Sequence, residues 1–294
     1  MNKVGFIGVG IMGKSMVRNL MKAGFELHIY ARTKSKVEGV IGEGAQFHES
    51  IKDCVQDCDA VITIVGFPQD VEEVYFDEGN ILDSAKEGAY LIDMTTTSPQ
   101  IAEKIYAEGT KRGFHVMDAP VTGGDTGAKA GTLSILVGGE KEDYEACMPL
   151  FEAMGTNINY QGKAGCGQHC KLANQIMIAG TLSGVCEALT YAKEQGLDPE
   201  VFMKSVATGA AGSKQLDTFG PKILKDDYAP GFFMKHFIKD MKLALIEANR
   251  KGLSLDVLSM VLANYEELEQ EGYGDLGTQA LMKFYDEEHR NTEE

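Results

Sequence analysis

A glycine-rich turn near the N-terminus constrains the fold of this 294-residue chain more than any other feature. The apolar residues 3–8 are typical of a buried strand, and Gly8, Gly10 and Gly13 follow in the spacing Gly-x-Gly-x-x-Gly, where a helical pattern begins. In such a turn the first glycine permits the bend, the second lets a pyrophosphate approach the backbone, and the third lets helix and strand pack closely. The helix N-terminus then presents N–H groups to phosphates. With a second strand about twenty residues further on, this pattern predicts dinucleotide binding.

Short apolar runs alternate with helical patterns over the first half of the chain. The strand-like runs cover residues 3–8, 26–30, 60–65, 89–94, 113–118 and 133–138. Strands that alternate with helices are typical of βαβ units and a mostly parallel sheet. Residues 1–162 are therefore predicted to form an α/β domain of the Rossmann type that binds the dinucleotide.

The pattern changes near residue 162, after which no strand pattern returns. From Gln168 to Gln195 the apolar residues recur at helical spacing without a proline, which predicts one long helix between the two domains. Further helices are expected over residues 199–208, 235–251, 256–270 and 278–288. Residues 163–294 are therefore predicted to form an all-helical domain for substrate binding and oligomerisation.

The chain is acidic, with 28 lysines and arginines against 44 aspartates and glutamates and a formal net charge of −16. Half of this charge comes from residues 266–294, which are expected to form a solvated surface. Nucleic acids and anionic membranes require a basic surface, so neither is an expected partner. No apolar run reaches the length of a membrane span and no signal-peptide pattern is present, so a cytoplasmic location is expected. The cysteines and histidines lack zinc-ligand spacing, so no metal is expected.

The residues that follow the second strand indicate which dinucleotide is bound. NAD-binding folds usually carry an acid there for the ribose hydroxyls, whereas this chain reads Tyr30-Ala-Arg32-Thr33-Lys-Ser-Lys36. Arg32 can stack on adenine and pair with a 2′-phosphate, and Thr33 and Lys36 can add a hydrogen bond or a charge. This favours NADP(H) over NAD(H); the alternative is a solvated basic loop without a ligand.

Two further loops follow the strands at residues 60–65 and 89–94. The first contains Val65 and Gly66, and the second contains Thr95 and Thr96. In open α/β sheets ligands bind outside the carboxyl ends of the strands, where both loops are expected. Both are therefore candidate cofactor contacts, and the sequence does not choose between the two threonines.

Thr122, Gly123 and Gly124 follow a predicted strand and a proline. Two consecutive glycines let neighbouring backbone N–H groups point into one concavity that suits a carboxylate, and the threonine adds a hydroxyl donor. The segment is a candidate site for an anionic substrate. Taken alone, a segment of this composition is more often a tight turn without a ligand.

Lys171 stands about one turn into the predicted long helix, within an apolar stretch. Burying a charged lysine is costly unless the side chain lines a cleft, where it can exchange a proton with a substrate near neutral pH. Asn174 and Gln175 follow three and four residues later, on the same helix face. The alternative is a lysine whose side chain reaches the solvent along the helix surface.

Together with the glycine turn, these segments resemble the β-hydroxyacid dehydrogenase family over essentially the whole chain. This family includes 3-hydroxyisobutyrate dehydrogenases, tartronate semialdehyde reductases and succinic semialdehyde reductases. The resemblance depends on the turn ending at Gly13, the segment from Asp118 to Ala128, the segment from Gly165 to Gln175, and the pair Lys239-Asp240.

The resemblance implies a role for each segment. Lys171 would give a proton to the carbonyl oxygen of the substrate as hydride arrives, or accept the hydroxyl proton in the reverse direction. An amide, either Asn174 or Gln175, would orient the substrate. The resemblance also implies a homodimer or homotetramer. Substrate-binding residues would be Thr122, Gly123, Gly124 and Lys239, and cofactor-binding residues would be Gly8, Gly10, Ile11, Met12, Gly13, Arg32, Thr33, Lys36, Val65, Gly66, Thr95, Thr96, Lys239 and Asp240.

The sequence thus predicts a reductase of small carboxylic semialdehydes that uses NADP(H) and is reversible as a 3- or 4-hydroxyacid dehydrogenase. One alternative is an oxidative decarboxylase of the 6-phosphogluconate dehydrogenase type, for which the chain is short. Another is an imine reductase, in which the catalytic lysine is usually replaced. A third is a non-catalytic NADPH-binding interaction module, against which Lys171 and the glycine pair argue.

Overall fold

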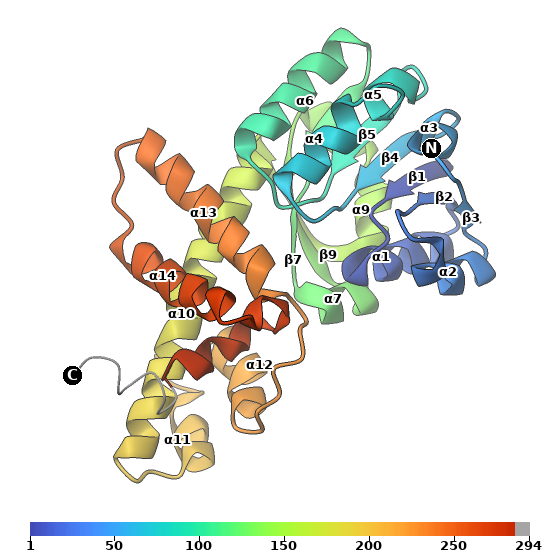
Figure 1. Cartoon of the computed structure of the whole chain (residues 1–294). Coiled ribbons are helices and arrows are strands. Elements are labelled where there is room, and N and C mark those ends of the chain that lie inside the picture. The colour runs from blue at the N-terminus through green and yellow to red at the C-terminus, as the bar shows by residue number, and fades with distance from the viewer. Residues whose placement is uncertain (286–294) are drawn as a thin grey trace. The chain divides into compact units, whose positions relative to one another are not determined.

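The computed structural model describes residues 1–285, and the chain divides into two compact units, Met1–Lys171 and Leu172–Glu294 (Figure 1). Part of the acidic segment 266–294 that is expected to form a solvated surface, namely residues 286–294, lies outside the described residues. The end of the helix predicted over residues 278–288 lies outside them as well. Each unit has its own apolar core, so the two are described in turn.

The N-terminal unit is built around a nine-stranded sheet in the order β3-β2-β1-β4-β5-β6-β8-β7, with β9 paired to β8. The pairs from β3 to β6 and the pair β8–β9 are parallel, whereas β8 runs antiparallel to β6 and β7. The strand order reverses between β1 and β4, the switch point at which Rossmann sheets bind dinucleotides. The strands are β1 (Lys3–Ile7), β2 (Glu26–Tyr30), β3 (Gln46–Phe47), β4 (Ala60–Thr63), β5 (Tyr90–Asp93), β6 (His115–Asp118), β7 (Val121–Thr122), β8 (Leu133–Gly138) and β9 (Gly155–Gly162).

Helices cover both faces of this sheet (Figure 1). Helices α1, α2, α7 and α9 pack over one core, and α3, α4, α5 and α6 over the other. The central strands are buried on both faces, which explains their continuous apolar runs. The helices are α1 (Ile11–Lys22), α2 (Glu38–Gly42), α3 (Ile51–Val55), α4 (Pro68–Phe76), α5 (Ile81–Ser84), α6 (Pro99–Lys111), α7 (Gly124–Ala130), α8 (Lys141–Ala146) and α9 (Met148–Met154), with a 3₁₀ turn η1 (Lys34–Lys36).

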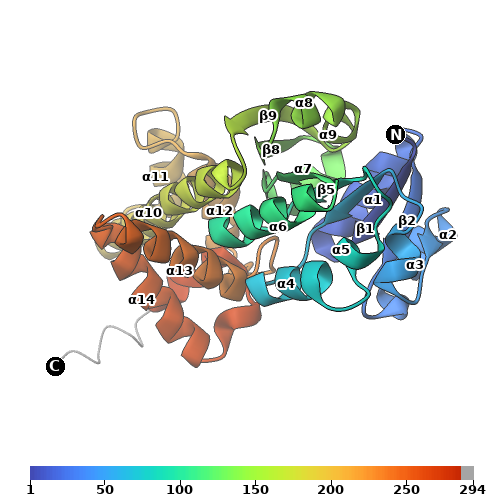
Figure 2. The same cartoon turned by 90° about the horizontal axis from the view of Figure 1, so that it is seen from above.

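The second unit is helical. Its core contains apolar residues from α10, α12, α13, α14 and η3, and Figure 2 shows α13 and α14 side by side. An edge-to-face contact between the rings of Phe237 and Tyr265 joins these two helices. The helices are α10 (Cys166–Glu194), which begins in the first unit, α11 (Pro199–Val206), α12 (Lys214–Ile223), α13 (Met234–Arg250) and α14 (Asp256–Gln270), followed by the 3₁₀ segments η2 (Tyr273–Asp275) and η3 (Thr278–Tyr285).

The helix α10 is both long and apolar. Among the described residues it alone has the length and hydropathy that could cross a membrane, with 44% of its most apolar window buried within the protein. Buried core helices pass the same test, so this is weak evidence for a membrane span.

The predicted architecture is confirmed: a mostly parallel Rossmann-type sheet is followed by a helical unit with one long helix. The sequence prediction missed the strands β3, β7 and β9 and the helix α12. β3 and β7 have two residues each, too few to show a periodic pattern, and β9 is largely polar because most of its residues are exposed or half-buried. Residues 278–285 form a 3₁₀ helix, in place of the α-helix implied by the spacing.

Candidate active site

The glycine turn after β1 has the geometry that a dinucleotide requires. Gly8 has a φ of +97°, and a Cβ there would lie 2.1 Å from the carbonyl oxygen of Ile64. A Cβ on Gly13 would lie 2.2 Å from the carbonyl oxygen of Gly8, so this glycine lets α1 approach the strand. A Cβ on Gly10 would meet no atom within 4 Å. The first and third glycines are therefore required by packing, whereas the second leaves open space for a ligand.

The N-terminus of α1 is available to an anion. Gly10 is the N-cap and offers no side-chain hydrogen bond, and the first turn contains no acid. Ile11 is an exposed apolar residue at the same place, with 46% of its surface accessible, and Met12 is half-buried. Unsatisfied N–H groups and the positive end of the helix dipole suit the pyrophosphate of a dinucleotide. The residues present therefore fit a nicotinamide dinucleotide.

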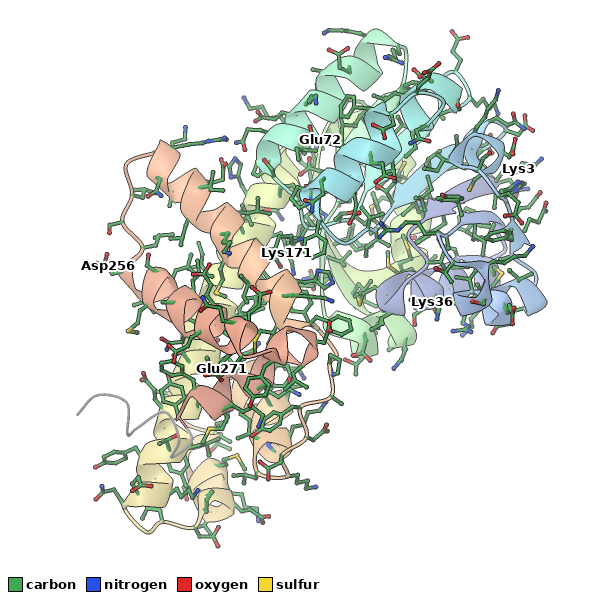
Figure 3. All side chains as sticks on the ribbon, in the orientation of Figure 1. Lys3, Lys36, Glu72, Lys171, Asp256 and Glu271 are labelled. Atoms are coloured by element: carbon green, nitrogen blue, oxygen red, sulfur yellow. The ribbon has the colours of Figure 1, made fainter. Side chains whose placement is uncertain are left out.

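The basic residues after β2 are solvent-exposed. The Arg32 side chain is 74% accessible and lies 3.3 Å from an Asp70 carboxylate oxygen at the start of α4. Thr33 precedes η1 and Lys36 ends it, and both are exposed. In Figure 3, Lys36 and Lys171 lie in separate parts of the N-terminal unit, so these two cations do not form one cluster.

The loops after β4 and β5 are joined to each other. The Val65 N–H donates a 2.9 Å hydrogen bond to the Thr95 hydroxyl, and Thr95 is buried, whereas Gly66 and Thr96 are half-buried. The Thr95 hydroxyl is therefore used inside the protein. Of the two threonines, Thr96 has the more accessible side chain.

Two buried carboxylates lie side by side where β5 and β6 end. Asp93 accepts hydrogen bonds from the Thr63 hydroxyl at 2.7 Å and from the Thr95 N–H at 3.1 Å. Burial raises the pKa of Asp93 to about 6 and also raises the pKa of its neighbour Asp118. Neither carboxylate is among the functional residues predicted from the sequence, although an acid that ends an apolar strand pattern is the signal that could have found both.

Asp118 connects the sheet to the start of α10. One of its carboxylate oxygens accepts a hydrogen bond from the Gly165 N–H and the other from the Gln168 N–H, both at 2.8 Å. A carboxylate at a helix N-terminus satisfies orphan donors and complements the helix dipole. Lys171 lies in the next turn, and the residue is only 7% exposed.

The candidate substrate segment lies just beyond Asp118. Thr122 pairs with Ser134 in β7–β8, and Gly123 and Gly124 follow with φ values of +128° and +63°. Both glycines are exposed and occupy a backbone region that other residues rarely adopt. The turn after Thr122 therefore depends on glycine, as the sequence suggested.

In the second unit, four polar side chains from α10 and α13 form a continuous chain. The Asn174 amide donates to the Gln175 side-chain oxygen at 2.8 Å, and the Gln175 amide donates to Asp240 at 2.7 Å. The second Asp240 oxygen lies 3.1 Å from the Lys239 ammonium nitrogen. Gln175 and Asp240 are each only 1% exposed, whereas Asn174 is half-buried. Both ends of the Gln175 amide are thus engaged within the protein.

The structure therefore groups the predicted residues within each unit. In the N-terminal unit, the predicted segments all follow the carboxyl ends of parallel strands. They are the glycine turn after β1, the loops after β2, β4 and β5, and the segment after β6. In the second unit, Asn174, Gln175, Lys239 and Asp240 are in contact. A turn at the switch point that fits a dinucleotide, together with a buried lysine, defines the class: an oxidoreductase that binds a nicotinamide dinucleotide.

Comparison with known proteins identifies the family. A family model described as the NAD binding domain of 6-phosphogluconate dehydrogenase matches residues 3–162. A second, described as the NAD-binding of NADP-dependent 3-hydroxyisobutyrate dehydrogenase, matches residues 165–285. The chain belongs to the β-hydroxyacid dehydrogenase family and is a hydroxyacid dehydrogenase that binds a nicotinamide dinucleotide.

Individual relatives agree with this assignment. The chain is 44% identical to a probable 3-hydroxyisobutyrate dehydrogenase-like 1, mitochondrial, of Arabidopsis thaliana, over 95% of this chain and 84% of that one. It is 37% identical to the 2-hydroxy-3-oxopropionate reductase of Escherichia coli, over 86% of each. Its structure resembles that of a Mycobacterium tuberculosis 3-hydroxyisobutyrate dehydrogenase with L-serine, with a TM-score of 0.88 and 27% identity over 97% of this chain and 99% of that one.

The contrast between two glycines of the turn gives a matched test. Gly13→Ala places a methyl group against the backbone and should lower the free energy of unfolding by about 1–3 kcal/mol. Gly10→Ala should leave stability nearly unchanged but weaken dinucleotide binding, because its methyl group fills open space at the helix N-terminus. Thermal unfolding without ligand and fluorescence titration with NADPH measure the two effects. Equal loss of binding and stability in both variants would contradict the division of roles.

The raised pKa of Asp93 predicts a pH dependence of folding stability. The folded protein keeps this proton up to about pH 6, whereas the unfolded chain loses it near pH 4. Stability should therefore fall as the pH rises from about 4 to about 6, and then level off. Asp93→Asn removes this contribution, so the difference in unfolding free energy between wild type and variant should change by up to about 3 kcal/mol across that window. Denaturant unfolding at several pH values measures it, and a constant difference would refute the assignment.

Proposed function

We propose that the protein reduces small carboxylic semialdehydes with NADPH and works in reverse as a 3- or 4-hydroxyacid dehydrogenase. The observation that carries this proposal is Lys171, a buried amine in the first turns of α10, within a chain of this family. The relative named 2-hydroxy-3-oxopropionate reductase acts, by its name, on a carboxylic semialdehyde. The structural relative with L-serine holds a 3-hydroxy acid.

A nicotinamide dinucleotide, when bound, would supply the hydride for the carbonyl carbon of the substrate. Lys171 gives a proton from its ammonium group to the carbonyl oxygen, so that the aldehyde becomes an alcohol and the lysine becomes neutral until it is reprotonated. The backbone N–H groups of Gly123 and Gly124 and the Thr122 hydroxyl bind the substrate carboxylate. Positioning of the substrate, rather than a covalent intermediate, provides most of the rate enhancement.

The polar chain in the second unit suggests how its members divide their roles. Because both ends of the Gln175 amide are engaged, we assign Gln175 to holding Asp240 in place and Asn174 to the substrate. Asp240 in turn fixes the ammonium group of Lys239, which is 12% exposed on its side chain and would contact substrate or nicotinamide. Asp240 would thus support cofactor binding through Lys239.

The preference for NADPH rests on the exposed residues after β2. Arg32 lies at the carboxyl end of a strand next to the switch point, where the adenosine ribose of a dinucleotide is held in this fold. Its ion pair with Asp70 is solvent-exposed and therefore weak, so a 2′-phosphate can replace it. Thr33 and Lys36 would add further contacts to that phosphate.

A homodimer or homotetramer is also part of the proposal. Among the described residues, most of the exposed large apolar side chains lie in the second unit, as expected for a surface that pairs with another copy. They are Met177, Tyr191, Leu197, Val201, Ile246, Leu253, Val257 and Met260. The proposed domain boundary near residue 162 lies between the family-model matches at residues 3–162 and 165–285, whereas the compact units divide after Lys171. A cytoplasmic location stays a prediction.

The alternative functions receive less support. A decarboxylase of the 6-phosphogluconate type normally has a larger second domain, and a non-catalytic binding module would not need a lysine buried at the start of α10. The relative from Arabidopsis thaliana is named as a probable 3-hydroxyisobutyrate dehydrogenase-like protein, and the relative from Escherichia coli is named as a 2-hydroxy-3-oxopropionate reductase.

The proposal is tested by turnover with and without Lys171. Wild-type protein should oxidise NADPH with at least one of succinic, methylmalonic or tartronic semialdehyde or glyoxylate. Lys171→Met should lower kcat by about 100-fold or more, because the proton donor is lost, while the Kd for NADPH changes little. Lys163→Met is the matched control, since Lys163 is an exposed lysine just before α10.

Two outcomes would argue against the proposed function. Wild-type protein that oxidises no NADPH across the panel would remove the reductase assignment. A Lys171→Met variant with the turnover of the Lys163→Met control would show that another group supplies the proton.

Cofactor preference is tested at Arg32. Arg32→Ala should raise the KM for NADPH by roughly 10- to 100-fold and leave the KM for NADH nearly unchanged, because only NADPH carries the 2′-phosphate. Arg112→Ala is the control, since Arg112 also forms an exposed ion pair, with Asp83, beside α5. An unchanged ratio of the two KM values would contradict the proposed preference.

A further inference from the structure

One side chain in the first turn of α10 is completely buried and takes no part in the reaction proposed for Lys171. Gln168 is 0% exposed. Its amide nitrogen donates a 2.7 Å hydrogen bond to the Thr95 carbonyl oxygen, and its amide oxygen accepts a 3.0 Å hydrogen bond from the Thr97 N–H. A single side chain therefore satisfies two buried backbone groups of the loop after β5, more than 70 residues earlier in the chain.

The backbone of the same residue is held as well. The Gln168 N–H donates to Asp118 at the end of β6. The preceding Gly167 makes this approach possible, because a Cβ there would lie 2.4 Å from the Leu136 carbonyl oxygen and 2.8 Å from an Asp118 carboxylate oxygen. The first turn of α10 is thus fixed to the loop after β5 by the Gln168 side chain and to the end of β6 by the Gln168 backbone N–H.

The attachment of this turn matters because the proposed proton donor lies next to it on the helix. The first turn of a helix lacks intrahelical partners for its N–H groups and is prone to fray. Lys171 lies three residues after Gln168, on the same face of α10, so any movement of this turn moves the lysine. A displacement of about 1 Å in a reacting group can cost about 100-fold in rate.

We infer that Gln168 is a positioning residue, which holds Lys171 at a fixed distance from the loop at Thr95–Thr97. That loop is hydrogen-bonded through Thr95 to Val65 in the loop after β4, so the amide couples the element that carries the proton donor to an element of the proposed cofactor site. The inference rests on the proposed role of Lys171. It assigns to Gln168 the alignment of proton donor and hydride donor, without contact with either substrate or cofactor.

Two variants of Gln168 test this inference. Gln168→Met keeps the size of the side chain but removes both hydrogen bonds to the loop. We expect kcat to fall by roughly 10- to 100-fold, with a much smaller change in the Kd for NADPH. The kcat measurements are made at a temperature where circular dichroism shows the variant to be fully folded.

Gln168→Glu supplies a readout that a purely structural role would not give. A protonated glutamic acid can donate to the Thr95 carbonyl oxygen and accept from the Thr97 N–H, as the glutamine does. An ionised glutamate cannot donate a hydrogen bond, and its negative charge would lie against the Thr95 carbonyl oxygen. The other titratable groups on the adjoining elements are Asp93, Asp118, His169 and Lys171. The kcat of this variant relative to wild type should therefore rise as the pH is lowered.

Two control variants separate positioning from general stability. Ile81→Val trims a buried side chain of α5 and costs about 0.5–1.5 kcal/mol without touching the hydrogen bonds of Gln168. Gln56→Met makes the same chemical change at an exposed glutamine. Both should keep the wild-type kcat. A Gln168→Met variant that also keeps it, or a Gln168→Glu ratio that does not vary with pH, would overturn the inference.

Hydrogen exchange gives a measurement that does not require turnover. The amides of residues 166–171 should exchange faster in Gln168→Met than in wild type or in Ile81→Val, because the turn is no longer tied to the loop. Unchanged exchange would overturn the inference even if no substrate were found. If Lys171→Met stayed active while the exchange increased, the assignment of the proton donor would fail and the attachment of the turn would stand.

Discussion

The join between the sheet and the first turn of α10 depends on the carboxylates that are buried where the parallel strands β5 and β6 end. Burying a carboxylate costs several kcal/mol unless hydrogen bonds compensate. Asp93 obtains them from Thr63 and Thr95, and Asp118 obtains them from backbone N–H groups at the start of α10. Asp93 thus holds the loop after β5, Asp118 holds the start of α10, and Gln168 joins that loop to the helix.

The two anions that the proposed reaction requires would be held mainly by backbone groups. The exposed N-terminus of α1 has no acid and no side-chain cap, and the two glycines after Thr122 are exposed and have positive φ values. Such groups would let a chain with a net charge of −16 bind a dinucleotide and the proposed carboxylate. Fixed N–H dipoles at short range matter more there than the overall charge, which is screened within about 8–10 Å at physiological salt.

Much of the fold and of the site could be predicted from the sequence because the signals are local. The strands β1, β2, β4, β5, β6 and β8 bury continuous apolar runs, and the glycine turn has a fixed spacing. The hydrogen bonds of Gln168 could not be predicted, because they join it to residues more than 70 positions away. The sequence also did not show which amide, Asn174 or Gln175, would orient the substrate. The two differ in burial, and this difference arises only when Asp240 of α13 packs against α10.

The buried Asp118 carboxylate also supports the role proposed for the lysine on α10. The first turn of this helix cannot shift without breaking two hydrogen bonds to Asp118, so it would hold a proton donor in a fixed position. A lysine further along α10 would lack this support from the sheet. Lys171 stands three residues after the buried amide of Gln168 and six after Gly165, whose N–H donates to Asp118. In the proposed mechanism these contacts would fix the lysine nitrogen relative to the loop after β5.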